Sequence, residues 1–147
     1  METVFLRPAV KEDAVFLYEL VNDNECRKNS LCSDPIPWEN HVEWFDRVLA
    51  SAEKCIYICM DQGKRIGQGR LEKTESGCRL SYSIIPKKRG HGYGNRLLSL
   101  LEKEAMKSGW GTVYGEVLIQ NEASARIFRH LGYRCKQKDD YLLFYKG

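Results

Sequence analysis

The sequence has no apolar run that approaches the roughly 20 residues needed to cross a bilayer. Its first residues also lack the basic and apolar segments that form a signal peptide. We therefore expect a cytoplasmic protein that has no membrane partner. The formal net charge is only +3, whereas domains that bind nucleic acid gather many basic residues on one face. A nucleic-acid partner is therefore not expected either.

Residues that bind metals are also sparse. The chain has three histidines, and none of its six cysteines forms a C-x-x-C pair, so the sequence predicts no metal site. An even number of cysteines is compatible with disulfides, but a chain of 147 residues without an export signal does not need them. We interpret the cysteines as small apolar residues of the core. They are Cys26, Cys32, Cys55, Cys59, Cys78 and Cys135.

The apolar residues recur with strand and helix periods, which predicts a single domain of the α/β (α+β) class over residues 1–147. We expect strands over residues 4–6, 55–60, 65–73, 79–85, 112–119, 133–136 and 141–145. Helices are expected over residues 11–22, 37–49, 97–105 and 123–131. Residues 23–37 are expected to be irregular, because they carry Asp, Asn, Ser and two prolines.

A glycine-rich segment joins the fourth predicted strand to a leucine-rich helix. Gly90, Gly92 and Gly94 follow a strand that ends at Pro86 and a run of three basic residues. Glycines let the backbone close around an anion, and the first turn of a helix offers free amides and the positive end of its dipole. The segment therefore predicts a pyrophosphate-binding loop, although a plain strand-to-helix connection has the same pattern. It is neither a P-loop nor a dinucleotide fingerprint.

Two motifs resemble one family. Arg89-x-x-Gly92-x-Gly94, placed between a strand and a helix, resembles the acetyl-CoA motif of the GNAT acyltransferase superfamily. The segment from Asn121 to Tyr133 is similar to the stretch that follows the fifth strand of that superfamily. The resemblance implies a GNAT-type fold, which is a mixed, mostly antiparallel sheet of about seven strands, split into a V, with helices on both faces. It also implies an N-acetyltransferase whose cofactor is acetyl-CoA (coenzyme A).

The resemblance further implies which residues bind the cofactor. The backbone of Ser83 and Ile84 is expected to meet the pantetheine arm, because this strand splays from its neighbour in the family. Asn121 and Ser124 are expected near the thiol, and Phe128 stands beside the cofactor where the family commonly has a tyrosine. The pyrophosphate is expected on the backbone amides of Arg89, Gly90, His91, Gly92, Tyr93, Gly94 and Asn95.

The reaction needs a base, because an ammonium group must lose a proton before it can attack a thioester. Glu116 is the predicted base, since it lies inside an apolar strand on the face opposite Val113 and Val117. Five residues separate it from Asn121, and a glutamate at this offset resembles the base of the ribosomal-protein N-terminal acetyltransferases. A strand glutamate that faces solvent or pairs with a basic neighbour is the alternative.

Phe128 departs from the family pattern, because phenylalanine has no proton to donate. We expect the leaving thiolate to be protonated by another hydroxyl, such as that of Ser124 or of a C-terminal tyrosine, or by water. The third possibility is a chain that binds acyl-CoA without turnover.

The acceptor side is predicted from the run of residues 26–30, from residues 67–70 and from the helix over 37–49. These segments resemble the acetyltransferases that act on nucleotide-linked 4-amino sugars in pseudaminic-acid-type pathways. Aromatic faces stack on sugars, and basic groups meet a diphosphate. The resemblance places Arg27, Asn29, His41 and Trp44 at the acceptor mouth, with His41 as a second base or a sugar contact. His41 and Trp44 also share one helical face, as core residues do.

The favoured function is therefore acetyl transfer from acetyl-CoA to the primary amine of a UDP-linked 4-amino sugar. A ribosomal-protein-type N-terminal acetyltransferase and a non-catalytic acyl-CoA-binding module are the alternatives. The expected partner is a small-molecule amine, and we expect a monomer or a homodimer.

Overall fold

The computed structural model describes residues 3–29 and 34–147, so Ser30 and Cys32 lie outside the described residues. Within these ranges, seven strands form one sheet. No helix in the same ranges is long and apolar enough to cross a membrane. The strands are β1 (Phe5–Pro8), β2 (Lys54–Asp61), β3 (Lys64–Thr74), β4 (Gly77–Ile84), β5 (Val113–Leu118), β6 (Arg134–Gln137) and β7 (Tyr141–Lys146).

The predicted helices are present, and α2 is an additional one. Residues 23–37 were expected to be irregular, but the carboxylate of Asp23 accepts hydrogen bonds from the amides of Glu25 and Cys26 at 3.1 and 3.3 Å. This N-cap satisfies two free donors and starts a short helix. The helical elements are η1 (Lys11–Asp13), α1 (Ala14–Val21), α2 (Asn24–Lys28), α3 (Trp38–Leu49), η2 (Pro86–Lys88), α4 (Tyr93–Ser108) and α5 (Glu122–His130).

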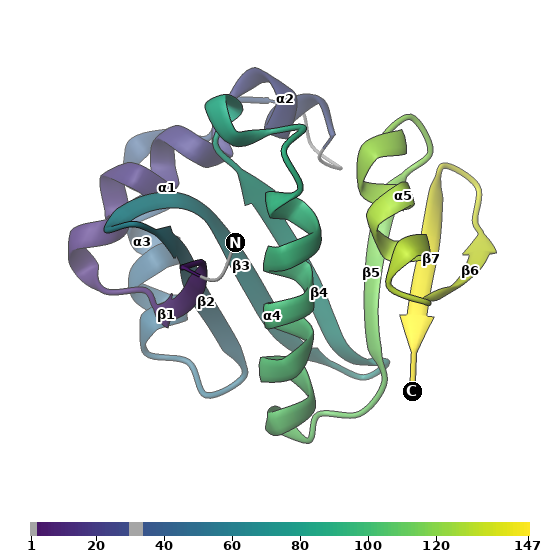
Figure 1. Cartoon of the computed structure of the whole chain (residues 1–147). Helices are drawn as coiled ribbons and strands as arrows, with labels where there is room; N and C mark the ends of the chain where they lie inside the picture. The colour runs from purple at the N-terminus through teal and green to yellow at the C-terminus, as the bar shows by residue number, and fades with distance from the viewer. Residues whose placement is uncertain (1–2, 30–33) are drawn as a thin grey trace.

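The sheet splits between β4 and β5. Its strand order is β1-β2-β3-β4-β5-β7-β6, and β4–β5 is the one parallel pair among the described strands. These two strands pair only at Cys78–Val113 and Arg79–Tyr114, and they then diverge (Figure 1). The mixed, mostly antiparallel sheet with a V-shaped split confirms the predicted fold class.

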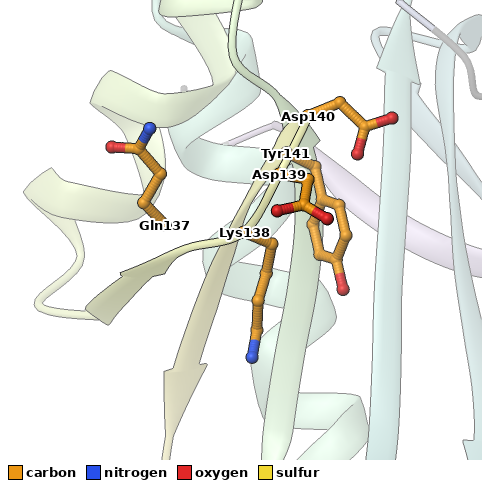
Figure 2. Close-up of a pocket in the computed structure, with 5 residues that line it drawn as sticks. All are labelled: Gln137, Lys138, Asp139, Asp140 and Tyr141. Atoms are coloured by element: carbon orange, nitrogen blue, oxygen red, sulfur yellow. The ribbon is translucent and has the colours of Figure 1, made fainter.

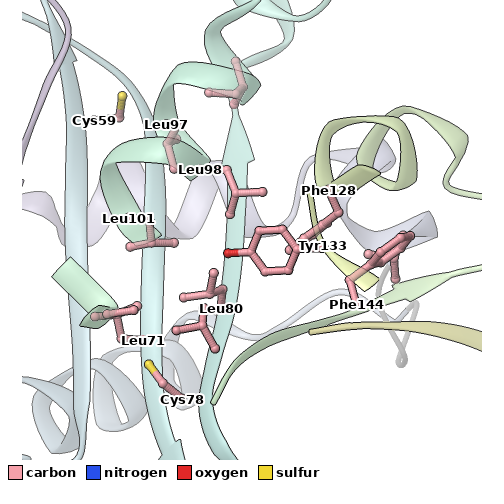
Figure 3. Close-up of a cluster of buried hydrophobic side chains, with 14 of the residues drawn as sticks. Cys59, Leu71, Cys78, Leu80, Leu97, Leu98, Leu101, Phe128, Tyr133 and Phe144 are labelled. Atoms are coloured by element: carbon pink, nitrogen blue, oxygen red, sulfur yellow. The ribbon is translucent and has the colours of Figure 1, made fainter. Parts of the chain in front are cut away.

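One face of the sheet is apolar and lies under α4 and α5. Leu97 and Leu101 of α4 lie against Gly67 and Gly69 of β3, where a Cβ would come within 3.0 to 3.2 Å of their methyl groups. The glycines therefore let the helix approach the strand closely. Figure 3 shows the leucines of α4 and Leu80 of β4 in this core, with three aromatic residues contributed from α5 onward.

The other face is covered only in part. Leu17 of α1 and two residues of α3, Phe45 and Val48, pack on Ile56 and Ile58 of β2. Beyond this second core, β3, β4 and β5 carry polar side chains on the same face, as described below. The sheet therefore has one closed face and one partly open face.

The cysteines fit their predicted role only in part. Cys59 and Cys78 are buried in the core, whereas Cys26 and Cys55 are half-buried. Cys135 is exposed, so its interpretation as a core residue was wrong. It lies on the short strand β6, where none of the four residues is buried.

Candidate active site

The loop between β4 and α4 presents backbone amides that have no partner. Gly90 and Gly92 adopt left-handed φ angles of 77° and 87°, which a Cβ would disfavour, and Gly92 is the N-cap of α4. The amides of residues 90–95 donate no hydrogen bond to any residue that the structure describes. Residues 90–92 are also exposed. Free amides at a helix start, together with the positive end of its dipole, suit an anion such as a pyrophosphate.

Arg89 differs from its prediction. Its amide donates a hydrogen bond to the carbonyl of Pro86 at 3.3 Å, so it does not belong with the free amides. Its side chain turns back into the protein, where Nε donates to the Ile84 carbonyl at 2.9 Å and Nη2 donates to Asp23 at 2.7 Å. The guanidinium therefore fastens the loop to the start of α2 and fixes the position of the amides that follow.

The end of β4 lies next to this loop. Ser83 and Ile84 come after the last residue of β4 that pairs with β5, so their main chain has no partner strand on the split side. Ser83 Oγ accepts a hydrogen bond from Gln68 Nε2 at 2.8 Å, and Ile84 is buried. No strand among the described residues covers this edge of β4, although the Ile84 carbonyl accepts a hydrogen bond from Arg89 Nε.

Two hydroxyl groups meet between the starts of α4 and α5. Ser124 Oγ lies 3.0 Å from the hydroxyl of Tyr82, whose ring would be 3.7 Å from a Cβ at Gly94. Asn121 Oδ1 accepts a hydrogen bond from the Ser124 amide at 3.3 Å and caps α5. Burial raises the pKa of Tyr82 to about 12, so this hydroxyl is protonated at neutral pH. The sequence predicted Ser124 but missed Tyr82, because strand alternation does not reveal which distant group a hydroxyl meets.

Phe128 is a core residue, and its predicted place beside the cofactor is corrected. Its side chain is 2% exposed, and its ring stacks on that of Phe144 with 5.1 Å between centroids. The ring also covers Gly115, where a Cβ would come within 2.5 Å of Cζ. A side chain enclosed in this way has no free surface for a ligand.

A groove opens on the partly covered face of the sheet. Strand register places Gln68 beside Ser83, Arg70 beside Ser81, and Glu72 beside Arg79, and directly opposed residues share one face. The groove has a volume of about 520 Å³ and joins this polar strip to Glu116, to α3 and to the start of β7. Its polar and aromatic lining residues include Asn29, Trp44, Arg70, Glu72, Arg79, Ser81, Glu116 and Tyr141.

Glu116 lines this groove and also contacts a basic neighbour. Its Oε1 lies 3.5 Å from Arg79 Nη1, and Arg79 also forms an ion pair with Glu72. The side chain of Glu116 is 25% exposed, so part of the carboxylate surface stays open to the groove. The pairing that the sequence left as an alternative is therefore present, together with access to the groove.

The predicted acceptor residues separate into two groups. Asn29 and Trp44 line the groove. Arg27 is not part of this lining; its Nε donates to the Val21 carbonyl at 2.6 Å and its Nη1 to the Asp34 carbonyl at 3.3 Å. These bonds hold α2 against the segment that leads to α3.

His41 is not in the groove, and its predicted roles as a base and as an acceptor contact are corrected. The residue is 1% exposed, its Nε2 lies 3.1 Å from the Ala14 carbonyl, and its ring is surrounded by aromatic rings. Burial lowers its pKa. His41 therefore joins α3 to α1 as a neutral core residue. No group of three or more His, Cys, Asp or Glu in the described ranges is arranged to hold a metal ion.

A second hollow lies at the turn between β6 and β7 and is lined by residues 137–141. Figure 2 shows Gln137 on one side of this turn, with Asp140 and Tyr141 on the other. Tyr141 also lines the groove. The turn therefore borders the groove, but its own hollow is formed by five consecutive surface residues.

A mixed sheet that splits beside an anion-binding turn is the fold of acyl-CoA-dependent acyltransferases. Residues 3–134 match the family model described as Acetyltransferase (GNAT) domain. The chain therefore belongs to the GNAT acetyltransferase family. Membership of this family makes it an N-acetyltransferase that uses acetyl-CoA.

Solved structures show the same fold at low sequence identity. Spermidine N-acetyltransferase from Vibrio cholerae, in complex with CoA and spermine, has a TM-score of 0.89 at 14% identity, over 99% of this chain and 96% of that one. An aminoglycoside acetyltransferase in complex with coenzyme A has a TM-score of 0.81 at 17% identity, over 97% and 94%. The protein yncA from Salmonella typhimurium, with its cofactor acetyl-CoA, has a TM-score of 0.76 at 19% identity, over 97% and 91%. No curated protein has a significantly similar sequence.

Proposed function

We propose that this chain is a cytoplasmic enzyme that transfers an acetyl group to the primary amine of a UDP-linked 4-amino sugar. The observation that carries the proposal is the pair of features at the split of the sheet. Free amides stand at the end of β4, and a polar groove with an accessible carboxylate opens on the partly covered face. A transferase needs both a donor site and an acceptor site at one opening.

The donor site has the groups that coenzyme A requires. The six amides of residues 90–95 hold the pyrophosphate, because they lie at a helix start and have no partner among the described residues. The edge of β4 at Ser83 and Ile84, which no described strand covers, holds the pantetheine arm. Acetyl-CoA supplies the acetyl group as a thioester.

Glu116 acts as the general base in this proposal. It takes a proton from the ammonium group of the acceptor, directly or through one water, so that the neutral amine can attack. Arg79 keeps the Glu116 carboxylate in place and also contacts Glu72. The base therefore sits in a charged network on the floor of the groove.

Phe128 stands where the family commonly has a tyrosine and has no hydroxyl to donate a proton. The hydroxyl pair of Tyr82 and Ser124 takes over this role. Tyr82 holds its proton at neutral pH because burial raises its pKa to about 12, and Ser124 Oγ lies 3.0 Å away. Ser124 donates a proton to the leaving sulfur while Tyr82 donates one to Ser124. The second proton, which the attacking nitrogen releases as the amide forms, returns through water to Tyr82, so that both hydroxyls end protonated. Both side chains lie beside the first turns of α4 and α5.

The sugar-nucleotide acceptor is supported by the lining of the groove. Trp44 offers an aromatic face, Asn29 offers an amide, and Arg70 offers a cation beside them. Aromatic faces stack on sugars and bases, and guanidinium groups bind phosphates. The other acceptors to be compared are N-terminal peptides, because of the Glu116 position, and the polyamine bound by a fold neighbour, spermine.

The test is an assay of thiol release from acetyl-CoA with a panel of amines. A UDP-linked 4-amino sugar, N-terminal peptides and spermidine are compared at equal concentration. The proposal predicts the fastest release with the sugar nucleotide. Release only with peptides would replace it by N-terminal acetylation. Cofactor binding without release on any amine would favour the non-catalytic module, for which the buried Phe128 is the supporting observation.

A further inference from the structure

Arg70 is a cation on the floor of the groove that has no carboxylate partner. It lies on β3 between Ile56 of β2 and Ser81 of β4. In residues 3–29 and 34–147, no Asp or Glu is within ion-pair distance of its guanidinium. Four other arginines each contact a carboxylate, and these are Arg7, Arg65, Arg79 and Arg89. Arg70 therefore differs from the arginines that fasten the fold.

The guanidinium of Arg70 is held in one orientation. Its Nε donates to Gln68 Oε1 at 3.0 Å, and Gln68, which is 4% exposed, donates to Ser83 Oγ at 2.8 Å. Its central carbon lies 4.5 Å from the ring centroid of Trp44. The two terminal nitrogens donate no hydrogen bond to any described residue. The open edge of a fixed guanidinium is the geometry that binds a phosphate or a carboxylate.

The electrostatic environment favours an anion at this position. Burial and the neighbouring Arg27 lower the pKa of Arg70 to about 10, so the side chain is still a cation at neutral pH. Arg70 is half-buried, and a partly buried charge without a partner costs free energy. A negatively charged oxygen that enters the groove offsets this cost. It can accept hydrogen bonds from the two terminal nitrogens of Arg70, which donate to no described residue.

We propose that Arg70, held by Gln68 and Trp44, binds an oxyanion group of the acceptor, a phosphate or a carboxylate, while the amine lies at Glu116. This inference rests on the proposed acetyl transfer in the same groove. The charge of Arg70 also repels acceptors that carry only positive charge, so we expect such acceptors to be poor substrates. The chain therefore differs in acceptor charge from its fold neighbour that is complexed with spermine.

The inference is tested by calorimetric titration of three probes: UDP, orthophosphate and acetate. The protein is first saturated with coenzyme A, so that the free amides of residues 90–95 are occupied. We expect UDP to bind the natural chain, and we expect Arg70→Gln to weaken that binding by about 10- to 100-fold. Arg47→Gln is the matched control. It removes the same charge from the exposed last turn of α3 and is expected to change nothing.

The outcomes separate the inference from the function on which it rests. The Arg70 site is overturned if Arg70→Gln binds all three probes as tightly as the natural chain, or if the natural chain binds none of them. Unchanged coenzyme A affinity in Arg70→Gln shows that the fold and the donor site are intact. Failure of the natural chain to bind coenzyme A contradicts the proposed function instead. Tighter binding of UDP than of acetate supports a phosphate, and the reverse order supports a carboxylate.

Discussion

At the scale of single residues, the carboxylate of Glu116 contacts Arg79 and also faces the groove. Arg79 lies 3.5 Å away and also holds Glu72. Such a carboxylate can be a base or only a member of an ion-pair network, and both roles are compatible with its position. The two roles respond differently to substitution of each acid.

Replacing Glu116 by Gln removes the proton acceptor and keeps the side-chain shape. We expect turnover to fall by about 100-fold or more, which is what a general base contributes. The loss is expected to be largest at lower pH, where more of the amine carries a proton. Thiol release measured against pH checks this. Glu72→Gln is the matched control, since it removes the other carboxylate of Arg79, and an equal loss in both variants would remove Glu116 as the base.

Gly115 is a residue whose role is entirely steric. A Cβ there would meet Phe128 Cζ at 2.5 Å, so we expect Gly115→Ala to lower the free energy of unfolding by about 1–3 kcal/mol through overpacking. Urea denaturation measures the change. A second variant, Gly115→Ala with Phe128→Leu, should recover part of the loss because the facing ring is gone. A Gly115→Ala protein as stable as the natural chain would contradict the described packing.

Single residues were also the hardest to predict from sequence. Arg89 was expected to supply an amide to the cofactor, but Pro86 takes that amide and Asp23 takes the side chain. His41 looked like a possible base, but only the packing of α3 on α1 shows that its ring is enclosed. Tyr82 acquires its importance from Ser124, which is 42 residues away. Arg70 acquires its importance from Gln68 and from Trp44 of α3, and local sequence pattern does not show the contact with Trp44.

At the scale of elements, the turn before α4 is the part that we propose binds the cofactor. Its glycines adopt left-handed angles, the helix start leaves amides free, and Arg89 fastens the turn to α2. The position of this turn was predictable, because its glycines and basic residues are close together in the sequence. The short helix α2 was not, since one capping carboxylate decided its formation.

A charged side chain in this turn should remove cofactor binding. We expect Gly92→Glu to weaken acetyl-CoA binding strongly, because both its bulk and its negative charge oppose the pyrophosphate. Calorimetry measures the affinity. Gly109→Glu is the matched control at the other end of α4. Gly109 has a left-handed φ angle of 69°, and a Cβ there would meet nothing within 4 Å. Gly109→Glu therefore introduces the same backbone strain and the same charge as Gly92→Glu, away from the turn. Equal losses of affinity in the two variants would count against the turn.

At the scale of the whole molecule, the arrangement depends on a sheet with one closed and one partly open face. The strand order and the split were predictable from the order of strands and helices together with the family resemblance. The polar strip over β3 and β4 was not recognised, although its residues alternate with glycines and leucines. Its meaning depends on what α1 and α3 leave uncovered, which only the packed molecule shows.

The packing of the N-terminal part depends on one buried carboxylate. Asp13 is 0% exposed and contacts Arg7 of β1, Arg65 of β3 and the amide of Val10. The hydrogen bonds from Arg7 hold the pKa of Asp13 well below its ordinary value, and burial opposes this shift without reversing it. The contact therefore joins three separate segments only while Asp13 carries its charge.

A pH dependence of stability follows from this shift. The unfolded chain takes up a proton at Asp13 more readily than the folded chain, so the free energy of unfolding should fall as the pH drops below about 4. Thermal unfolding at pH 7 and at successive lower values measures the fall. Asp13→Asn should be less stable at pH 7 by about 3 kcal/mol and should depend less on acid. The same acid dependence in both proteins would assign the effect to other groups.

The central claim is that the free amides of residues 90–95 hold the diphosphate of coenzyme A. The most direct measurement is a two-dimensional ¹H–¹⁵N nuclear magnetic resonance titration of the labelled chain with coenzyme A. We predict that the amide signals of Gly90 to Asn95 move most, while that of Arg89 moves less because its amide is already bonded to Pro86. Coenzyme A that binds while these six signals stay in place would contradict the claim.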